Sequence, residues 1–575
     1  MPYRAPLTEI QYMLDHMVGF SDLAETERFA EATTDMVSAI LTEAAKLNDE
    51  VIAPLNRVGD TQGAVLENGV VRSSPGFKEA YQTMAEGGWV GISGSTDHGG
   101  MGLPFTLNAA FNDMTSGAAL ALGLNPLLTQ GQIEALEVHA SDEIKALYLP
   151  KLTSGEWTGT MNLTEPQAGT DVGAVATKAV PNGDGTYAIS GQKIFISWGD
   201  HDMAENVCHL VLARLPDAPK GTKGISLFMV PKLIPDENGN PGVANSLKVV
   251  SLEHKMGLHG SPTCVMSYEG ATGWLVGPEQ GGMAAMFTMM NNARLQVGVQ
   301  GIGVAEGAYQ HALEYALERK QGRSPIEGGT GTIIDFADVR RMLIEAKAEI
   351  FAARAIALAC AVAIDMQKAT GEADWAARAA LLTPIAKSYG TDIGVKVSYI
   401  GQQVHGGMGF IEETGAAQYA RDVRVTTIYE GTNGIQAMDL VARKMMDQGE
   451  AAFRLFEEGE EVAEAARNTV PALAEAVWGA AETLRECVEW LVEQDLQDRF
   501  AGAVPFQWAC ARVMGAFYHL KAAHLEGGKG PRTELAAYYI ERLLPEHVGS
   551  ASTISPHERA LLLSVGYAAG RGGGY

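Results

Sequence analysis

A single carboxylate beside a predicted helix start is the strongest candidate for chemistry in this 575-residue sequence. Glu430 lies in RVTTIYEGTNGIQAMDLVARKMM, residues 424–446, between an apolar run and a helix. Thr432 or Asn433 is expected to cap that helix, because both side chains accept from free N–H groups of a first turn. Desolvation at the edge of an apolar cleft raises the pKa of an acid, which suits a general base near neutral pH. The ordinary alternative is an acid that only interacts with the helix dipole.

The helix that follows Glu430 is expected to bury one face. Its apolar residues recur at helical spacing, and they are Ile435, Met438, Ala442 and Met445. Tyr429 precedes the acid and Gly431 follows it, so small neighbours leave room for a ligand to approach.

The segment MNLTEPQAGTDVGA, residues 161–174, is a second candidate binding element. Its threonines offer hydroxyls, and its glycines let backbone N–H groups approach a flat or anionic ligand. These residues are Thr164, Thr170, Gly169 and Gly173. The alternative is an ordinary polar turn.

The segment GQKIFISWG, residues 191–199, is a third candidate. Phe195, Ser197 and Gly199 alternate with Ile194, Ile196 and Trp198. One strand face would therefore present an aromatic ring and a hydroxyl to a ring system. The alternative is a half-buried strand.

Two further patterns could hold an anion. The cations of YALERKQGRSP, residues 315–325, form a pyrophosphate clamp or a solvated helix end. The turn GQQVHGGMGF, residues 401–410, offers backbone N–H groups, with His405 as a packed histidine rather than a base. No glycine motif of a Rossmann or P-loop site occurs. Instead, close helix packing is expected at Gly298, Gly301, Gly303 and Gly307.

Composition narrows the class of protein. The net charge of −26 argues against binding to nucleic acid or an anionic membrane. The five cysteines are isolated and show no ligand spacing, so buried thiols are expected rather than a metal site or disulfides. The N-terminus lacks the features of a signal or transit peptide, and no apolar run approaches ~18 residues. A cytoplasmic protein without a transmembrane segment is expected.

The spacing of apolar residues along the chain predicts an α+β multidomain fold. Residues 1–158 show helical patterns, including a stripe of Phe29, Met36, Ile40 and Ala44. Short β-branched runs in 159–275 predict an antiparallel β-barrel or sheet domain. Helical periodicity returns in 276–446 as a helical bundle, and 447–575 form an additional helical domain. In this last domain Leu473, Val477, Ala480, Leu484, Cys487 and Leu491 keep helical spacing.

Five ordered motifs together resemble the acyl-CoA dehydrogenase family. They are LTEPQAGTD, KIFISWG, YALERKQGR, QQVHGGMGF and IYEGTNGIQ, and the similarity covers roughly residues 30–446. The opening segment and the C-terminal block resemble a large bacterial branch of that family. The resemblance implies FAD bound between the β domain and the second helical domain, an acyl-CoA substrate, and an electron-transfer flavoprotein as electron acceptor.

The resemblance also assigns residues. It implies FAD contacts from the β domain by Leu163, Thr164, Gly169, Thr170, Phe195 and Ser197. Thr432 and Asn433 would approach FAD beside the base. Arg319, Gln321, Gln403 and Gly407 would reach it from the neighbouring subunit of a homodimer. Phe336 stands where many relatives have His near that second contact, which is a departure from the family pattern.

Glu430 matches the catalytic base of the family, and Tyr429, Gly431, Arg294 and Asn291 are the expected substrate contacts. Some relatives place the base near residues 290–294, where this chain has no acid. The implied reaction is α,β-dehydrogenation of an acyl-CoA to the trans-2-enoyl-CoA.

The branch resemblance implies 3-methylmercaptopropionyl-CoA as the substrate, with a medium- or long-chain fatty acyl-CoA of β-oxidation as the alternative. Met286, Met289 and Met290 would lie before the helix that floors the acyl pocket, unless they pack in the core. An acyl-CoA oxidase or a non-catalytic family member are further alternatives.

Overall fold

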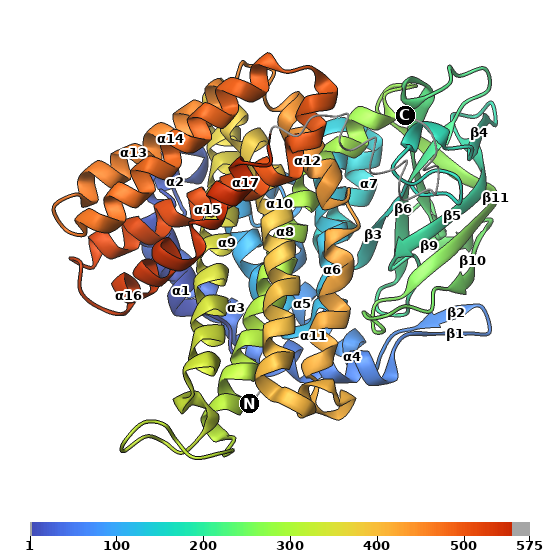
Figure 1. Cartoon of the computed structure of the whole chain (residues 1–575). Coiled ribbons are helices and arrows are strands. Elements are labelled where there is room, and N and C mark those ends of the chain that lie inside the picture. The colour runs from blue at the N-terminus through green and yellow to red at the C-terminus, as the bar shows by residue number, and fades with distance from the viewer. Residues whose placement is uncertain (1–2, 555–575) are drawn as a thin grey trace, which may run out of the picture. The chain divides into compact units, whose positions relative to one another are not determined.

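The computed structural model describes residues 3–554, which divide into two compact units. The β unit holds residues 39–296 with 3–5, and the helical unit holds 6–38 with 297–554. Figure 1 shows the sheet drawn in green and the C-terminal helices in orange and red. Among the described residues, no helix is both long and apolar enough to span a membrane.

A seven-stranded sheet forms the centre of the β unit. Its strands are β3 (Trp157–Asn162), β4 (Lys178–Pro181), β5 (Tyr187–Ser197), β6 (Asn206–Arg214), β7 (Ile225–Pro231), β10 (Leu247–Leu252) and β11 (Thr263–Val276). The order is β10-β11-β5-β4-β6-β3, and β7 pairs with β11 and β6. The expectation of an antiparallel sheet is wrong for β3, which runs parallel to β6. The chain between them is long enough for the crossover that parallel pairing requires.

Helices precede the sheet in this unit. They are α3 (Thr34–Leu47), α4 (Asn56–Gln62), α5 (Phe77–Glu86), α6 (Phe105–His139) and α7 (Asp142–Thr153). The stripe predicted for the first of these is wrong in part, because Val37 and Leu41 are buried while Met36 is 36% exposed. The two short pairs β1 (Val65–Glu67) with β2 (Val70–Arg72), and β8 (Leu233–Pro235) with β9 (Pro241–Ala244), complete the unit.

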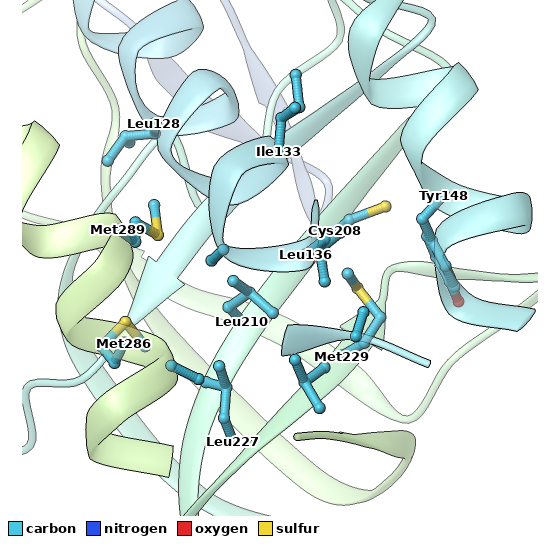
Figure 2. Close-up of a cluster of buried hydrophobic side chains, with 14 of the residues drawn as sticks. Leu128, Ile133, Leu136, Tyr148, Cys208, Leu210, Leu227, Met229, Met286 and Met289 are labelled. Atoms are coloured by element: carbon cyan, nitrogen blue, oxygen red, sulfur yellow. The ribbon is translucent and has the colours of Figure 1, made fainter. Parts of the chain in front are cut away.

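One hydrophobic cluster joins the sheet to α6, α7 and the start of α8 (Gly282–Glu318). Figure 2 shows Met286 and Met289 of α8 pointing toward Leu210 and Leu227 of the sheet. Both methionines are fully buried, and Met290 packs against the cluster. These methionines therefore lie inside α8 and serve core packing, rather than preceding the helix as expected.

Long helices build the helical unit. They are α1 (Leu7–Tyr12), α2 (Ser21–Ala24), α9 (Ala337–Thr370), α10 (Ala373–His405), α11 (Ala416–Val423) and α12 (Asn433–Arg443). Gly298 of α8 lies against the backbone of α10, where an added Cβ would come within 2.5 Å of the Ala386 oxygen. Gly301 meets Gly390 in the same way. The close packing predicted for these two glycines is confirmed.

The C-terminal helices pack on this bundle. They are α13 (Glu450–Ala466), α14 (Pro471–Glu493), α15 (Leu496–Leu525), α16 (Pro531–Tyr538) and α17 (Glu546–Ala551). Arg512 of α15 makes two bonds to Glu349 of α9, of 2.5 and 2.7 Å, and both side chains are fully buried. The stripe predicted for α14 is buried as expected except at Cys487, where Val488 takes the inward position. Residues 555–575 of the predicted domain lie outside the described part of the chain.

Candidate active site

Glu430 stands on a sharp turn directly before α12. Its φ is +55° and that of Gly431 is +84°, so two consecutive residues adopt the left-handed conformation. For a residue other than glycine this costs of order 1 kcal/mol or more, and it persists only where the surroundings hold it. Thr432 is the N-cap, and its hydroxyl accepts from the Ile435 N–H at 3.3 Å. The predicted cap is confirmed at Thr432.

Two side chains hold the carbonyl groups of this turn. The Nζ of Lys387, on α10, donates to the Gly431 oxygen at 2.9 Å. The Nε2 of Gln436, on α12, donates to the Glu430 oxygen at 3.0 Å. Lys387 is fully buried and Gln436 is 1% exposed, so solvent does not compete for either bond. We define the base turn as residues 429–432, with these two side chains as its supports.

Asn433 points from the base turn toward α10. Its Oδ1 accepts from Lys387 Nζ at 2.8 Å, and its Nδ2 donates to Asp392 at 2.8 Å and Thr391 at 3.0 Å. Burial raises the pKa of Asp392 to about 6, although the bond from Asn433 and the charge of Lys387 oppose the rise. The side chain predicted to contact a cofactor therefore ties α12 to α10.

Tyr429 joins the turn to α8. Its hydroxyl donates to the Oε1 of Gln300, which is 1% exposed. Burial, and then the neighbouring carboxyl of Glu430, raise the pKa of Tyr429 above its ordinary range, so the hydroxyl stays protonated and can donate. The base turn is thus attached to three helices of the helical unit.

The stripe predicted for α12 is displaced. Ile435, Met438 and Ala442 are half-buried, and Met445 is buried beyond the end of the helix. The buried positions within the helix are Gln436, Ala437, Asp439, Leu440 and Val441. The inward face thus contains polar side chains that a search for apolar periodicity excludes.

In the β unit, Phe195 lies on a bulge of β5. The pairing with β11 shifts between Ile196 and Lys193, and Phe195 has a φ of +59°. A bulge of this kind redirects a side chain. Phe195 is 60% exposed and Ser197 is half-buried, whereas Ile196 is buried. A ring and a hydroxyl are therefore accessible here, but the predicted alternation is wrong at Gly199, which is buried, and the bulge rather than regular alternation exposes Phe195.

A buried ion pair fixes the loop beside this bulge. Glu165 accepts from Lys193 Nζ at 2.8 Å, from Thr177 Oγ1 at 2.6 Å and from the Ala176 N–H at 2.8 Å. Burial alone would raise the pKa of Glu165, but the adjacent Lys193 and the hydrogen bonds lower it to about 2. Lys193 also donates to the Leu163 oxygen at 2.9 Å.

The loop thereby keeps its shape while leaving other groups accessible. Thr164 is half-buried, whereas Gly169 and Thr170 are exposed. Within residues 3–554, no atom outside Gly169 and its two chain neighbours lies within 4 Å of its Cβ position.

The remaining predicted residues of the helical unit lie at the ends of α8 and α10. Arg319 donates to Gln321 at 3.4 Å just after α8, and both are exposed. Gln403 and Gly407, at the end of α10, are also exposed. These two ends are adjacent, because Tyr315 stacks on His405 with ring centroids 4.4 Å apart. His405 is buried and bonded to the Gly401 oxygen, as expected for a packed histidine.

Two predicted substrate contacts lie on α8 within the β unit. Arg294 is 8% exposed. Asn291 belongs to the helix, but its side chain lies outside the described part of the structure. Both assignments stay predictions.

The match to family profiles covers well over half of the chain. Profiles of the acyl-CoA dehydrogenase N-terminal, middle and C-terminal domains match residues 34–156, 160–271 and 280–446. The chain belongs to the acyl-CoA dehydrogenase family. It is an oxidoreductase. Its helical, β and helical parts follow one another as the sequence predicted.

Curated members of the acyl-CoA dehydrogenase family extend the match. The chain is 46% identical over 522 residues to the 3-methylmercaptopropionyl-CoA dehydrogenase of Ruegeria pomeroyi, covering 88% of each protein. It is 34% identical over 472 residues to the broad-specificity linear acyl-CoA dehydrogenase of Mycobacterium tuberculosis, covering 78% of this chain and 76% of that protein.

A solved structure shows that the shared fold includes the C-terminal helices. Caenorhabditis elegans ACDH-11 in complex with C11-CoA superposes with a TM-score of 0.77 at 20% identity, over 93% of this chain and 91% of that one. At this identity the likeness concerns the fold alone.

Sequence reasoning did not single out the residues that support the site. Lys387 and Gln300 lie in ordinary helical patterns, and no local signal distinguishes them. Gln436, Glu165 and Lys193 lie inside three of the recognised motifs, so the motifs themselves were the available signal.

Proposed function

We propose that the chain is an FAD-dependent acyl-CoA dehydrogenase that converts an acyl-CoA thioester to the trans-2-enoyl-CoA, with Glu430 as the base. The observation that carries this proposal is the base turn, where an acid is held in the left-handed conformation by buried donors. A backbone conformation that costs free energy and is nevertheless held in place is typical of functional sites.

The accessible groups of the β unit fit a flavin. Phe195 offers an exposed ring for stacking, Ser197 a hydroxyl, and Gly169 an exposed backbone that a ligand can approach. We propose that Leu163, Thr164 and Thr170 complete the FAD contacts there, and that Thr432 and Asn433 contribute from the helical unit. Bound there, FAD would supply the hydride acceptor for the β-hydrogen of the substrate, and an electron-transfer flavoprotein would be the electron acceptor.

The residues of the chain perform the acid–base half of the reaction. The carboxylate of Glu430 removes the proton α to the thioester carbonyl. A carboxylate is too weak a base for this carbon acid unless donors stabilise the charge that develops on the carbonyl oxygen, a role proposed for the Glu430 backbone N–H. The supports of the base turn fix the two peptides that follow Glu430 before substrate arrives, so less reorganisation of the turn is needed.

Replacing the acid tests the proposal. In the Glu430→Gln variant turnover should fall by roughly 10²- to 10⁴-fold, because an amide cannot accept the proton. FAD content and acyl-CoA binding should remain, as measured by absorbance and titration. Glu413→Gln, an exposed acid after α10, is the matched control and should keep full activity. A Glu430→Gln enzyme with more than about a tenth of wild-type turnover would exclude this base.

For the acyl group we propose 3-methylmercaptopropionyl-CoA, oxidised to methylthioacryloyl-CoA, because the most extensive similarity reported above is to a dehydrogenase of that name. The second candidate, a linear fatty acyl-CoA, is supported by the Mycobacterium tuberculosis relative. Profiling kcat/KM from butyryl- to palmitoyl-CoA, with the methylthio substrate included, separates them. A maximum at palmitoyl-CoA would refute the methylthio assignment, because a short pocket rejects long chains sterically.

The exposed groups at the ends of α8 and α10 are proposed to serve the partner subunit of a homodimer. Gln403 lies sixteen residues along α10 from Lys387, which is roughly 24 Å at 1.5 Å per residue. Arg319, Gln321 and Gly407 lie at the same distant end. Within one chain they are far from the base turn, which supports a role at the FAD of a second subunit.

A further inference from the structure

The base turn depends on a buried ammonium group from another helix. Lys387 is fully buried, and it donates hydrogen bonds to the Gly431 oxygen and to the Asn433 amide oxygen. The charge of Lys387 also opposes the rise that burial causes in the pKa of Asp392. Desolvation of an ammonium group is costly unless the group is bonded, so each of these partners helps to keep Lys387 in place.

The bonds of Lys387 and Gln436 meet on consecutive peptide groups. Gln436 holds the carbonyl of Glu430, and Lys387 holds that of Gly431. Together they fix the orientation of the peptide that follows the acid and of the next one. An added Cβ at Gly431 would come within 2.8 Å of Gln436 Nε2, so this support is in close contact with the turn.

The position of Lys387 is itself rigidly set. It lies on the turn of α10 where Gly298 and Gly301 bring the backbone of α8 into contact with residues 386–391. On α8, Gln300 lies between these two glycines in sequence and accepts from the hydroxyl of Tyr429. Lys387 and Gln300 thus originate from two helices, α10 and α8, that cannot separate without losing their closest packing.

We propose that Lys387, with Gln436, is a positioning residue that holds the Glu430–Gly431 peptide in the left-handed conformation from which the carboxylate reaches the substrate α-carbon. This inference rests on the proposed function for its effect on turnover. The support of the turn is a property of the fold and is measurable without substrate.

The test compares two methionine variants on one helix. Lys387→Met removes the support, whereas Lys396→Met removes another half-buried lysine of α10 that pairs with Glu345 and Glu349. Hydrogen–deuterium exchange is measured for residues 428–436 in the FAD-loaded enzymes. Four amides there, of Ile428, Tyr429, Ile435 and Gln436, are hydrogen-bonded. Exchange should rise at least about tenfold in Lys387→Met and stay at the wild-type rate in Lys396→Met.

Kinetics supply the second measurement. With 3-methylmercaptopropionyl-CoA, kcat of Lys387→Met should fall by roughly 10- to 100-fold, the scale for a catalytic group misplaced by about 1 Å, while KM stays within about threefold. Deuterium at C2 should then give a larger isotope effect on kcat, because proton removal becomes slower. A loss of folded enzyme would leave the isotope effect unchanged.

Each outcome decides something. Unchanged exchange at residues 428–436 in Lys387→Met would overturn the inference, as would an equal rise in Lys396→Met. If exchange rises in Lys387→Met but the wild-type enzyme oxidises no acyl-CoA, the positioning role is supported and the proposed function is refuted. Raised exchange with an unchanged kcat and isotope effect would show that the held conformation is not required for catalysis, and would overturn the catalytic part.

Discussion

Removing the buried carboxylate at Glu349 should loosen the C-terminal helices from the bundle. Burial alone would raise the pKa of this carboxyl, but Arg512 and then Lys396 lower it from 4.5 to about 2. That difference corresponds to roughly 3 kcal/mol of folding free energy at neutral pH. Breaking a buried pair typically costs about 3–5 kcal/mol. Arg512 keeps a second partner, Glu546 at 2.8 Å, so a loss near the lower end of that range is expected.

The perturbation is Glu349→Gln, followed by thermal unfolding of the FAD-loaded enzyme and by limited proteolysis. A loss of about 3 kcal/mol should lower Tm by roughly 6–10 °C for a unit of this size. Cleavage should appear first in residues 447–554, because α15 loses its main polar attachment to α9. The control is Asp338→Asn on the same helix, whose side chain is 73% exposed and pairs with Arg341. Its effect on Tm should be within about 2 °C.

The contribution of the Glu349 carboxyl to stability should depend on pH in one direction only. A carboxyl whose pKa is lower in the folded state stabilises the protein above its unfolded pKa, and this contribution disappears as the pH falls from about 4.5 toward 2. The Tm gap between wild type and Glu349→Gln should thus be full at pH 7 and 5.5 and narrower at pH 4 and 3. Equal Tm values at pH 7, or a gap that stays constant down to pH 3, would refute this account of the ion pair.

Two further variants test the proposed cofactor contacts. Phe195→Ala should weaken FAD binding roughly tenfold, the value of one aromatic contact, while the Tm of the apoprotein changes by no more than about 2 °C because the ring is 60% exposed; unchanged FAD affinity by fluorescence titration would remove this residue from the site. Wild type should be a dimer by light scattering, and Arg319→Ala should lose FAD and shift toward monomer together. Full FAD occupancy in a monomer would contradict the shared site.

Sequence patterns located most elements because the signals for them are local. The strands of the sheet contain β-branched runs, and the cap at Thr432 depends on a bond to a residue three positions away. The tight hairpin of β1 and β2 was missed, although Asn68 and Gly69 between two apolar runs, both with positive φ, are its usual signal.

The buried face of a helix and the distant partners of its side chains were harder to predict. The inward face of α12 differs from the predicted stripe because α10 and α15, which pack against it, select Gln436 and Leu440 over Ile435 and Met438. Lys387 bonds to a residue 44 positions away. A lysine in an alanine-rich helix gives no indication that it is buried, so only the three-dimensional packing could assign its role.

One stretch of α10 connects the base turn to the C-terminal helices. Lys387 faces the base turn, whereas two residues later Tyr389 donates to Glu349 at 2.5 Å and lies 3.0 Å from Arg512. Three residues before Lys387, the oxygen of Pro384 accepts from Gln507 of α15 at 2.9 Å. Proline cannot donate to the helix ladder, so this segment of α10 is less constrained by its own hydrogen bonds than a regular helix. Contacts from α15 replace part of that constraint, and the C-terminal helices therefore help to define where Lys387 holds the carbonyl of Gly431 in the base turn.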